Sequence, residues 1–317
     1  MRPLAVLGIV VSLCMPVLGA SESRGDAEIK RGEELRKKGT PAARREALQA
    51  YEAAVAAYRE SGDRKGLGNA IHAAGRILFD LEEHPRAAAV LEEAIEIRRA
   101  TGAPLDLSNS IQTLGAARWA LGENAKALAL YTEALSLRRK VGDQPGMATS
   151  LYALAVIYWM WGDTQNAVRT YEEVLRLRRS LKDTYGEAHA LNAMGLAFAT
   201  AGDHGTAMRR YQQALPLWRK LRNRMGESYT LNNIGMSQSA SGNHRGAIAT
   251  FRQVLEIARE TEEKRTIAYA SNNTASAYAS LRDWAKAEEH YGEGLQRSRD
   301  IGDRMGESAA LAGIARM

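Results

Sequence analysis

The sequence is poor in cysteine and proline, with one cysteine and seven prolines in 317 residues. The cysteine, Cys14, lies in an apolar N-terminal segment whose removal is predicted below. The mature chain would then lack cysteine, which excludes disulfides, thiolate metal sites and cysteine nucleophiles. Scarce proline favours helices, because proline disrupts a helix interior. The 45% of apolar residues is typical of a soluble protein.

Motifs for catalysis are also lacking. The sequence contains no His-Glu-x-x-His, phosphate-binding loop, Gly-x-Ser-x-Gly or calcium loop. His84, His204 and His244 share one position between helices, but equivalent positions in packed helical units lie about 8–10 Å apart. Imidazoles at that distance cannot share a metal ion that each binds at about 2 Å. We therefore expect no enzyme activity, no cofactor and no metal site.

The first twenty residues have the layout of a secretory signal peptide. Arg2 supplies a positive charge, residues 4–13 are mostly apolar, and small residues lead to a cleavage site after Ala20. The alternative, a membrane anchor, needs about 20 apolar residues, and this run is shorter and is broken by Pro16. We expect export to the periplasm or the medium of a bacterium, with no stable membrane insertion after cleavage.

The charge balance is mildly basic, with 43 Lys and Arg against 37 Asp and Glu, a net charge of +6. Basic clusters recur near the ends of alternate helices, at residues 98–99, 138–140, 178–179 and 219–220. Cations there favour the negative end of the helix dipole, so a solvated face is the simpler interpretation. The alternative, a nucleic-acid scaffold, needs aromatic residues interleaved with the basic ones and predicts salt-sensitive binding. We expect no nucleic-acid partner.

A 40-residue period runs through the chain without insertion or deletion. Gly62, Gly102, Gly142 and Gly302 occupy one register, and residues 182, 222 and 262 continue it. A fixed period of this size is typical of units that stack into a solenoid. The period predicts an irregular first repeat at residues 21–61, six regular repeats at 62–301 and a C-terminal capping helix at 302–317.

Each repeat is predicted to be a pair of helices. In the third repeat, apolar residues at helical spacing indicate helices over 105–121 and 125–141, separated by a turn at Gly122. Gly162, Gly202 and Gly242 repeat this stop, and Asp163, Asp203 and Asn243 follow as N-caps.

Small and large apolar residues alternate regularly within the repeats. An alanine recurs at one position in the second helix of every pair: Ala47, Ala87, Ala127, Ala167, Ala207, Ala247 and Ala287. One helical turn later comes a ring or leucine: Tyr51, Leu91, Tyr131, Tyr171, Tyr211, Phe251 and Tyr291. The first helix carries a matching small residue: Gly75, Gly115, Ala155, Gly195, Gly235 and Ala275. These positions predict where helices approach most closely.

This pattern of small residue, alanine and aromatic resembles the tetratricopeptide repeat signature. The 40-residue spacing is similar to the long-helix repeats of kinesin light chains, of Pins/LGN-type spindle adaptors and of bacterial arrays linked to peptidase or signalling domains. The resemblance covers about residues 26–317. It implies an all-α, right-handed superhelical solenoid of about seven helix-turn-helix repeats plus a single C-terminal helix.

The resemblance also implies a concave groove, lined by the first helix of each pair, that holds a peptide or protein segment. The positions that match this face are aromatic toward the N-terminal half and rich in asparagine toward the C-terminal half: Asn69, His72, Phe79, Asn109, Gln112, Trp119, Tyr152, Trp159, His189, Asn192, Tyr229, Asn232, Asn233, Tyr269, Asn272 and Asn273.

An asparagine amide can pair with both the N–H and the C=O of an extended backbone, and aromatic pockets can select side chains. Alternatively, the asparagines bond neighbouring helices, and Trp119 and Trp159 fill space between repeats. The carboxylate clamp of some family members needs a cation at the position of His72, Gln112 and Tyr152, and none is present there.

The sequence therefore predicts a non-catalytic scaffold or adaptor whose partner is a protein or peptide. An alternative is the sensory array of a peptidase or signalling system whose catalytic part is another chain or a missing C-terminal domain. The oligomeric state and the identity of the partner stay open.

Overall fold

A computed structural model describes residues 23–317 of the chain, which form fifteen α-helices and no strand. The predicted signal peptide, residues 1–20 with Cys14, lies outside the described residues. The helices pack into two units, one ending at Gly102 and one comprising Ala103–Met317. Among the fifteen helices, none combines the length and the apolar character that a membrane span requires.

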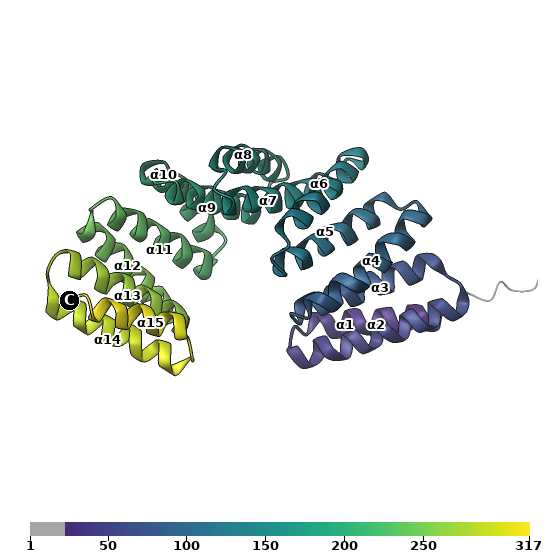
Figure 1. The fold of residues 1–317 in the computed structure, drawn as a ribbon, viewed down its shortest axis with the longest axis horizontal. Coiled ribbons are helices and arrows are strands. Elements are labelled where there is room, and N and C mark those ends of the chain that lie inside the picture. The colour runs from purple at the N-terminus through teal and green to yellow at the C-terminus, as the bar shows by residue number, and fades with distance from the viewer. Residues whose placement is uncertain (1–22) are drawn as a thin grey trace, which may run out of the picture. The chain divides into compact units, whose positions relative to one another are not determined.

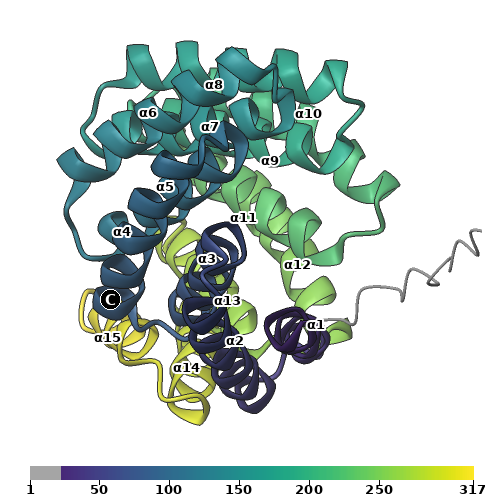
Figure 2. The ribbon, with the colours of Figure 1, turned by 90° about the vertical axis from the view of Figure 1, so that its right-hand side faces the viewer.

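The first unit contains four helices: α1 (Arg24–Lys37), α2 (Pro41–Ser61), α3 (Arg64–Asp80) and α4 (His84–Thr101). Each packs against the next along the chain, and Figure 2 shows α1 beside α2. Ser23 caps α1 by accepting a hydrogen bond from the Asp26 backbone N–H. Residues 38–40 form the turn between α1 and α2, in which Gly39 has a positive φ of 72°, and the turn between α3 and α4, residues 81–83, has the same length.

The second unit contains eleven helices. Its first six are α5 (Pro104–Ala120), α6 (Asn124–Val141), α7 (Gln144–Met160), α8 (Thr164–Ser180), α9 (Thr184–Thr200) and α10 (His204–Lys220). The remaining five are α11 (Arg224–Ala240), α12 (His244–Glu260), α13 (Lys264–Ser280), α14 (Trp284–Asp300) and α15 (Arg304–Ile314). Within this unit, α7 and α9 lie on the inner side of a curved stack and α8 and α10 on its outer side (Figure 1).

The predicted helix pairs are confirmed, because α5 and α6 match residues 105–121 and 125–141 to within one residue. Gly162, Gly202 and Gly242 adopt positive φ angles of 75°, 85° and 81°, which glycine tolerates without steric cost. Asp163 accepts a hydrogen bond from the Asn166 backbone N–H as an N-cap. Asp203 and Asn243 cap α10 and α12 in the same way.

The repeated small residues lie where helices approach most closely. The seven alanines at one repeat position, Ala47 through Ala287, all have 0% exposure. On the first helix of a pair, a Cβ atom on Gly195 would lie 2.5 Å from the Tyr211 ring, and one on Gly235 would lie 2.5 Å from Phe251. Hence the glycines allow a buried ring to rest directly on the facing backbone.

Candidate functional site

An aromatic cavity lies between α5 and α11, on the inner side of the second unit. Its volume is about 580 Å³. Three tryptophans and four tyrosines line it: Trp119, Trp159, Trp218, Tyr152, Tyr171, Tyr185 and Tyr229. The size and the dominance of aromatic side chains are typical of ligand-binding pockets. We call this site the aromatic cavity.

The rings of the cavity contact one another across two successive repeats. The Tyr152 ring packs edge-on against Tyr171 at 5.6 Å and lies 5.0 Å from the His189 ring. His189 stacks with Tyr185 at 6.2 Å, and Tyr185 meets Trp218 edge-on at 5.2 Å. Edge-to-face and offset pairs at these centroid separations are favourable beyond the area that they bury. One connected set of rings therefore joins α7, α8, α9 and α10.

Trp218 forms the base of the cavity because the next helix presents a glycine to it. A Cβ atom on Gly226 would lie 2.5 Å from the indole, so only glycine lets the ring rest against α11. Trp218 is 2% exposed, and its Nε1–H has no hydrogen-bond partner among residues 23–317. By contrast, Tyr185 and Tyr229 are 55% and 51% exposed at the mouth. The cavity thus has a buried aromatic base and an open aromatic rim.

The cavity lining is uncharged at neutral pH. It contains no Asp, Glu, Lys or Arg among the described residues that form it. Its one histidine, His189, has a pKa lowered by burial and by the nearby charge of Arg178, so the ring is neutral at pH 7. Burial also raises the pKa of Tyr152 and of Tyr171. A charged group entering this site would lose its hydration without gaining an ionic partner.

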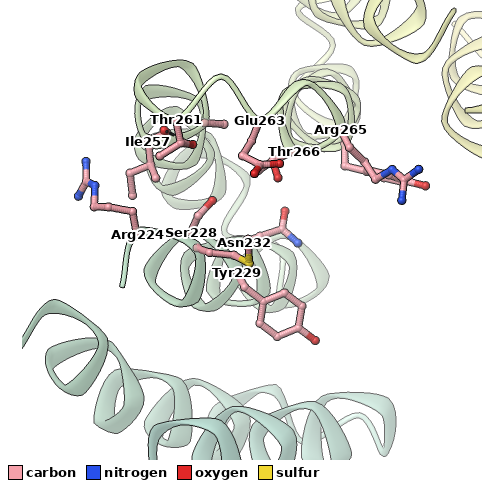
Figure 3. A pocket seen from close by; sticks show the side chains of 12 residues that line it. Arg224, Ser228, Tyr229, Asn232, Ile257, Thr261, Glu263, Arg265 and Thr266 are labelled. Atoms are coloured by element: carbon pink, nitrogen blue, oxygen red, sulfur yellow. Dashed lines mark hydrogen bonds between the residues drawn. The ribbon is translucent and has the colours of Figure 1, made fainter. Parts of the chain in front are cut away.

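A second cavity adjoins the first along α11. It has a volume of about 600 Å³ and lies between α11, the end of α12 and the start of α13 (Figure 3). Ile257 and Ala258 form its apolar floor, and Met225 and Tyr229 line both cavities. We call it the Ala258 cavity. Met225, 71% exposed, forms with Tyr229 the ridge between the two.

Six of the sixteen predicted groove residues line the aromatic cavity: Trp119, Tyr152, Trp159, His189, Asn192 and Tyr229. Trp159 also donates a hydrogen bond from Nε1 to Thr200 Oγ1 at 2.8 Å, so it links successive repeats. Tyr229, together with Asn232 and Tyr269, lines the Ala258 cavity.

Asn109 and Gln112 hold a buried arginine. Arg138 donates to Asn109 Oδ1 at 3.1 Å and to Gln112 Oε1 at 3.0 Å, and it also donates to the Gly146 carbonyl at 2.9 Å. Burial lowers the pKa of Arg138, and the charge of Asp143 opposes that shift. The two amides therefore take part in a contact between repeats.

Asn192 and Asn272 also bond the following repeat. Asn192 is 4% exposed and donates from Nδ2 to Thr230 Oγ1 at 2.8 Å. Asn272 is buried and donates to the Gly306 carbonyl at 3.1 Å. Both contacts match the alternative in which asparagines join neighbouring helices.

The other three asparagines differ in environment. Asn273 donates to Asn232 Oδ1 at 3.0 Å, and both side chains are half-buried. Asn233 is buried, and its Nδ2 has no hydrogen-bond partner within residues 23–317. Of the asparagines predicted in the C-terminal half, Asn232 and Asn273 thus pair with each other on the more open surface.

The three predicted residues of the first unit are separate from the two cavities. Asn69 accepts a hydrogen bond from Arg98 Nη2 at 2.8 Å. Burial lowers the pKa of His72 to about 3, with repulsion from Arg98 and Arg76. The Phe79 ring lies 5.1 Å from the ring of His84.

Sequence reasoning missed Tyr171, Tyr185 and Trp218 as cavity residues. Trp218 stands at the repeat position that holds Arg138 and Arg178, at the end of the helix where the sequence predicts a basic face. A tryptophan at a position that is otherwise arginine departs from the repeat pattern, and this departure could have identified Trp218 as a cavity residue. Tyr185 lies in the first turn of α9, one position ahead of the glycine that faces Arg178.

The basic clusters are largely paired with glutamates. Five arginines of the second unit form such pairs: Arg139–Glu173 at 3.1 Å, Arg179–Glu187 at 2.6 Å, and Arg219–Glu227, Arg259–Glu293 and Arg299–Glu307 at 2.8 Å. Within residues 23–317 no group of three or more His, Cys, Asp or Glu side chains could hold a metal ion.

Sequence profiles of known families match most of the repeat region. Tetratricopeptide-repeat profiles match residues 67–101, 107–180 and 182–260, which together exceed half of the chain. A profile of anaphase-promoting complex subunit 5 matches residues 42–80. A comparison with curated protein sequences gives no match.

Solved structures with a similar fold include aspartyl phosphate phosphatase F from Bacillus subtilis, with a TM-score of 0.63, 15% identity and coverage of 97% of this chain and 80% of that one. BtubC from P. vanneervenii has a TM-score of 0.59 and 19% identity over 75% of this chain and 91% of its own.

The Rap conjugation gene regulator of plasmid pLS20, in complex with the Phr* peptide, has a TM-score of 0.55 and 16% identity over 88% of this chain and 74% of its own. At these identities the likeness shows a shared helical-repeat fold. The profile matches, the helix pairs and the solenoid packing agree, and the chain belongs to the tetratricopeptide-repeat family.

Proposed function

We propose that this chain is a non-catalytic interaction protein that binds an extended segment of a partner in the aromatic cavity. The observation that carries the proposal is the uncharged lining, with its seven Trp and Tyr rings, open to solvent through Tyr185 and Tyr229. Apolar or aromatic side chains of a partner can bury area there without leaving a charge unpaired. The Phr* peptide complex of a similarly folded Rap protein supports a peptide as the occupant.

The test uses a phage-displayed library of random peptides selected on the full chain. A synthetic copy of an enriched peptide is titrated into the protein, with affinity measured by calorimetry. Trp119, Trp159 and Trp218 make three of the five tryptophans part of the cavity, so the intrinsic fluorescence should change on binding.

Replacing Tyr185 and Tyr229 together by alanine should weaken the selected peptide at least tenfold, which is about 1.4 kcal/mol. The matched control is Trp284→Ala, which removes an aromatic side chain of similar exposure, 46%, from outside the cavity. Equal affinity of the double variant and the wild type would place binding on another surface.

We also propose that the chain is exported and cleaved after Ala20. The first described helix, α1, is capped by Ser23, so cleavage there would leave the repeat fold intact. Mass spectrometry of the protein from its native host should find a chain that starts at Ser21. A chain that still carries residues 1–20 would contradict cleavage.

A further inference from the structure

We propose that the Ala258 cavity is a second anchor pocket, which holds one large apolar side chain of the same partner segment that fills the aromatic cavity. The proposal rests on the proposed function and adds the spacing and the chemistry of the bound segment. Its basis is a change in the packing between helices at one repeat position.

At that position the second helices of three successive repeats, α6, α8 and α10, carry a large side chain. Arg138, Arg178 and Trp218 each lie against a glycine of the following helix, namely Gly146, Gly186 and Gly226. A Cβ atom on any of these glycines would lie within 2.7 Å of the facing side chain. Large residue and glycine therefore form a matched pair that fills the junction between repeats.

The next repeat breaks this pairing. The large residue is replaced by Ala258, and the glycine is replaced by Thr266. A threonine adds much less volume than an arginine or tryptophan removes. The side-chain volume that is lost leaves the Ala258 cavity, whose lining includes both Ala258 and Thr266.

A buried polar group faces this cavity. Ser228 is 5% exposed, and its hydroxyl has no hydrogen-bond partner among residues 23–317. Figure 3 shows the Ser228 side chain extending from α11 toward Thr261 and Ile257. A buried hydroxyl without a partner is unfavourable, and a bound peptide group would supply the missing hydrogen bond.

The charges at the mouth favour a neutral side chain. Arg224, Glu263 and Arg265 line the cavity, and Arg224 is already paired with Glu227 and Glu260. A ligand of either sign would therefore meet both attractive and repulsive groups. The floor of Ile257 and Ala258 offers apolar contact only. A large uncharged apolar side chain is therefore the best match.

Because Met225 and Tyr229 line both cavities, one ligand that crosses this ridge can reach both of them. The cavities flank α11, and packed helices lie about 8–10 Å apart. A polyproline-type extended segment has three residues per turn and rises about 3.1 Å per residue, so residues i and i+3 point the same way about 9 Å apart. The bound segment should present two bulky apolar residues three positions apart.

The experiment fills the Ala258 cavity with the residue pair that fills the equivalent space one repeat earlier. The variant Ala258→Trp with Thr266→Gly copies the pairing of Trp218 with Gly226 and should stay helical by circular dichroism. The probe is the synthetic peptide selected on the wild type from the phage library, together with versions in which each bulky residue is alanine.

We expect the double variant to bind the peptide at least tenfold more weakly. On the wild type, one of the two peptide alanine changes should also cost at least tenfold, and on the double variant that same change should cost nothing further. If the double variant does not fold, Ala258→Leu is the replacement, since it enlarges only the floor of the cavity.

Two results would overturn the inference while the proposed function stands. One is an unchanged affinity of the double variant when the Tyr185 and Tyr229 double variant binds weakly. The other is a peptide whose affinity depends on a single bulky residue. If no peptide is enriched, or if variants of both cavities bind normally, the proposed function fails as well.

Discussion

Three asparagines at one repeat position, Asn192, Asn232 and Asn272, make different contacts. Asn192 and Asn272 are buried and bond the next repeat, whereas Asn232 and Asn273 bond each other at a more open surface. The sequence predicts that these positions face inward, because the register fixes the helix face. It does not predict which amide finds a partner, since that depends on whether the next repeat supplies a residue such as Thr230.

Asn192→Ala should therefore destabilise the fold. The change removes a buried hydrogen bond and leaves the Thr230 side chain without its donor, so the free energy of unfolding should fall by about 1–2 kcal/mol. The measurement is urea denaturation followed by circular dichroism. Asn232→Ala is the control and should shift the free energy by less than about 0.5 kcal/mol. Equal effects of the two changes would contradict this division.

His72 should make stability depend on pH. Burial and the charges of Arg98 and Arg76 lower its pKa to about 3 in the folded state, against about 6.5 in the unfolded chain. Between these values the unfolded chain binds more protons, so the free energy of unfolding falls as the pH drops below about 6.5. His72→Gln should flatten this dependence in urea titrations at several pH values between 7 and 4. If the free energy of unfolding depends on pH in the same way for the variant and the wild type, His72 is not the source of the dependence.

At the scale of the helix, boundaries are the best-predicted feature of the chain. A glycine that ends one helix and an Asp or Asn that caps the next stand at fixed spacing, so the local sequence determines where helices start and stop. Trp218 was missed because its helix also carries the basic residues of the outer face, and a repeat pattern hides single departures. Gly226, which faces Trp218, stands at the same repeat position as Gly146 and Gly186. The glycine therefore does not indicate that a tryptophan lies opposite it.

One helix contains a residue that weakens it. Pro216 lies in the interior of α10, is exposed, and cannot donate a backbone hydrogen bond to Gln212. Pro216→Ala should raise the free energy of unfolding by about 1–3 kcal/mol, measured by urea denaturation. The control is Arg176→Ala, at the equivalent exposed position of α8, which should change it little. A loss of stability on removing Pro216 would show that the neighbouring repeats require the distortion.

At the scale of the whole molecule, the sequence predicts the repeat architecture well and the division into units poorly. The period passes residues 102 and 103 without a gap, so spacing alone marks no boundary there. The local chemistry does change, because Ala103 precedes α5 without a side-chain cap where Asp143 and Asp183 cap α7 and α9. Both cavities belong to the unit that follows this point.

Residues 103–317 should therefore fold and bind without the first unit. Repeat proteins are stabilised mainly by contacts between neighbouring repeats, and every residue of both cavities lies in this segment. The fragment should bind the selected peptide within about threefold of the full chain, a difference of about 0.6 kcal/mol by calorimetry. A fragment that is helical but binds at least tenfold more weakly would show that the first unit contributes to recognition.

The ridge between the cavities has a further consequence, which concerns oxidation. Met225 is more exposed than most apolar residues in the described part of the chain. Oxidation to the sulfoxide would convert a flexible apolar side chain into a polar and chiral one. Both anchor sites would then share a hydrophilic edge, and an apolar segment would have to cross it to occupy them together. Oxidation of this one sulfur atom would thereby lower the affinity for the partner, and a methionine sulfoxide reductase would restore the affinity.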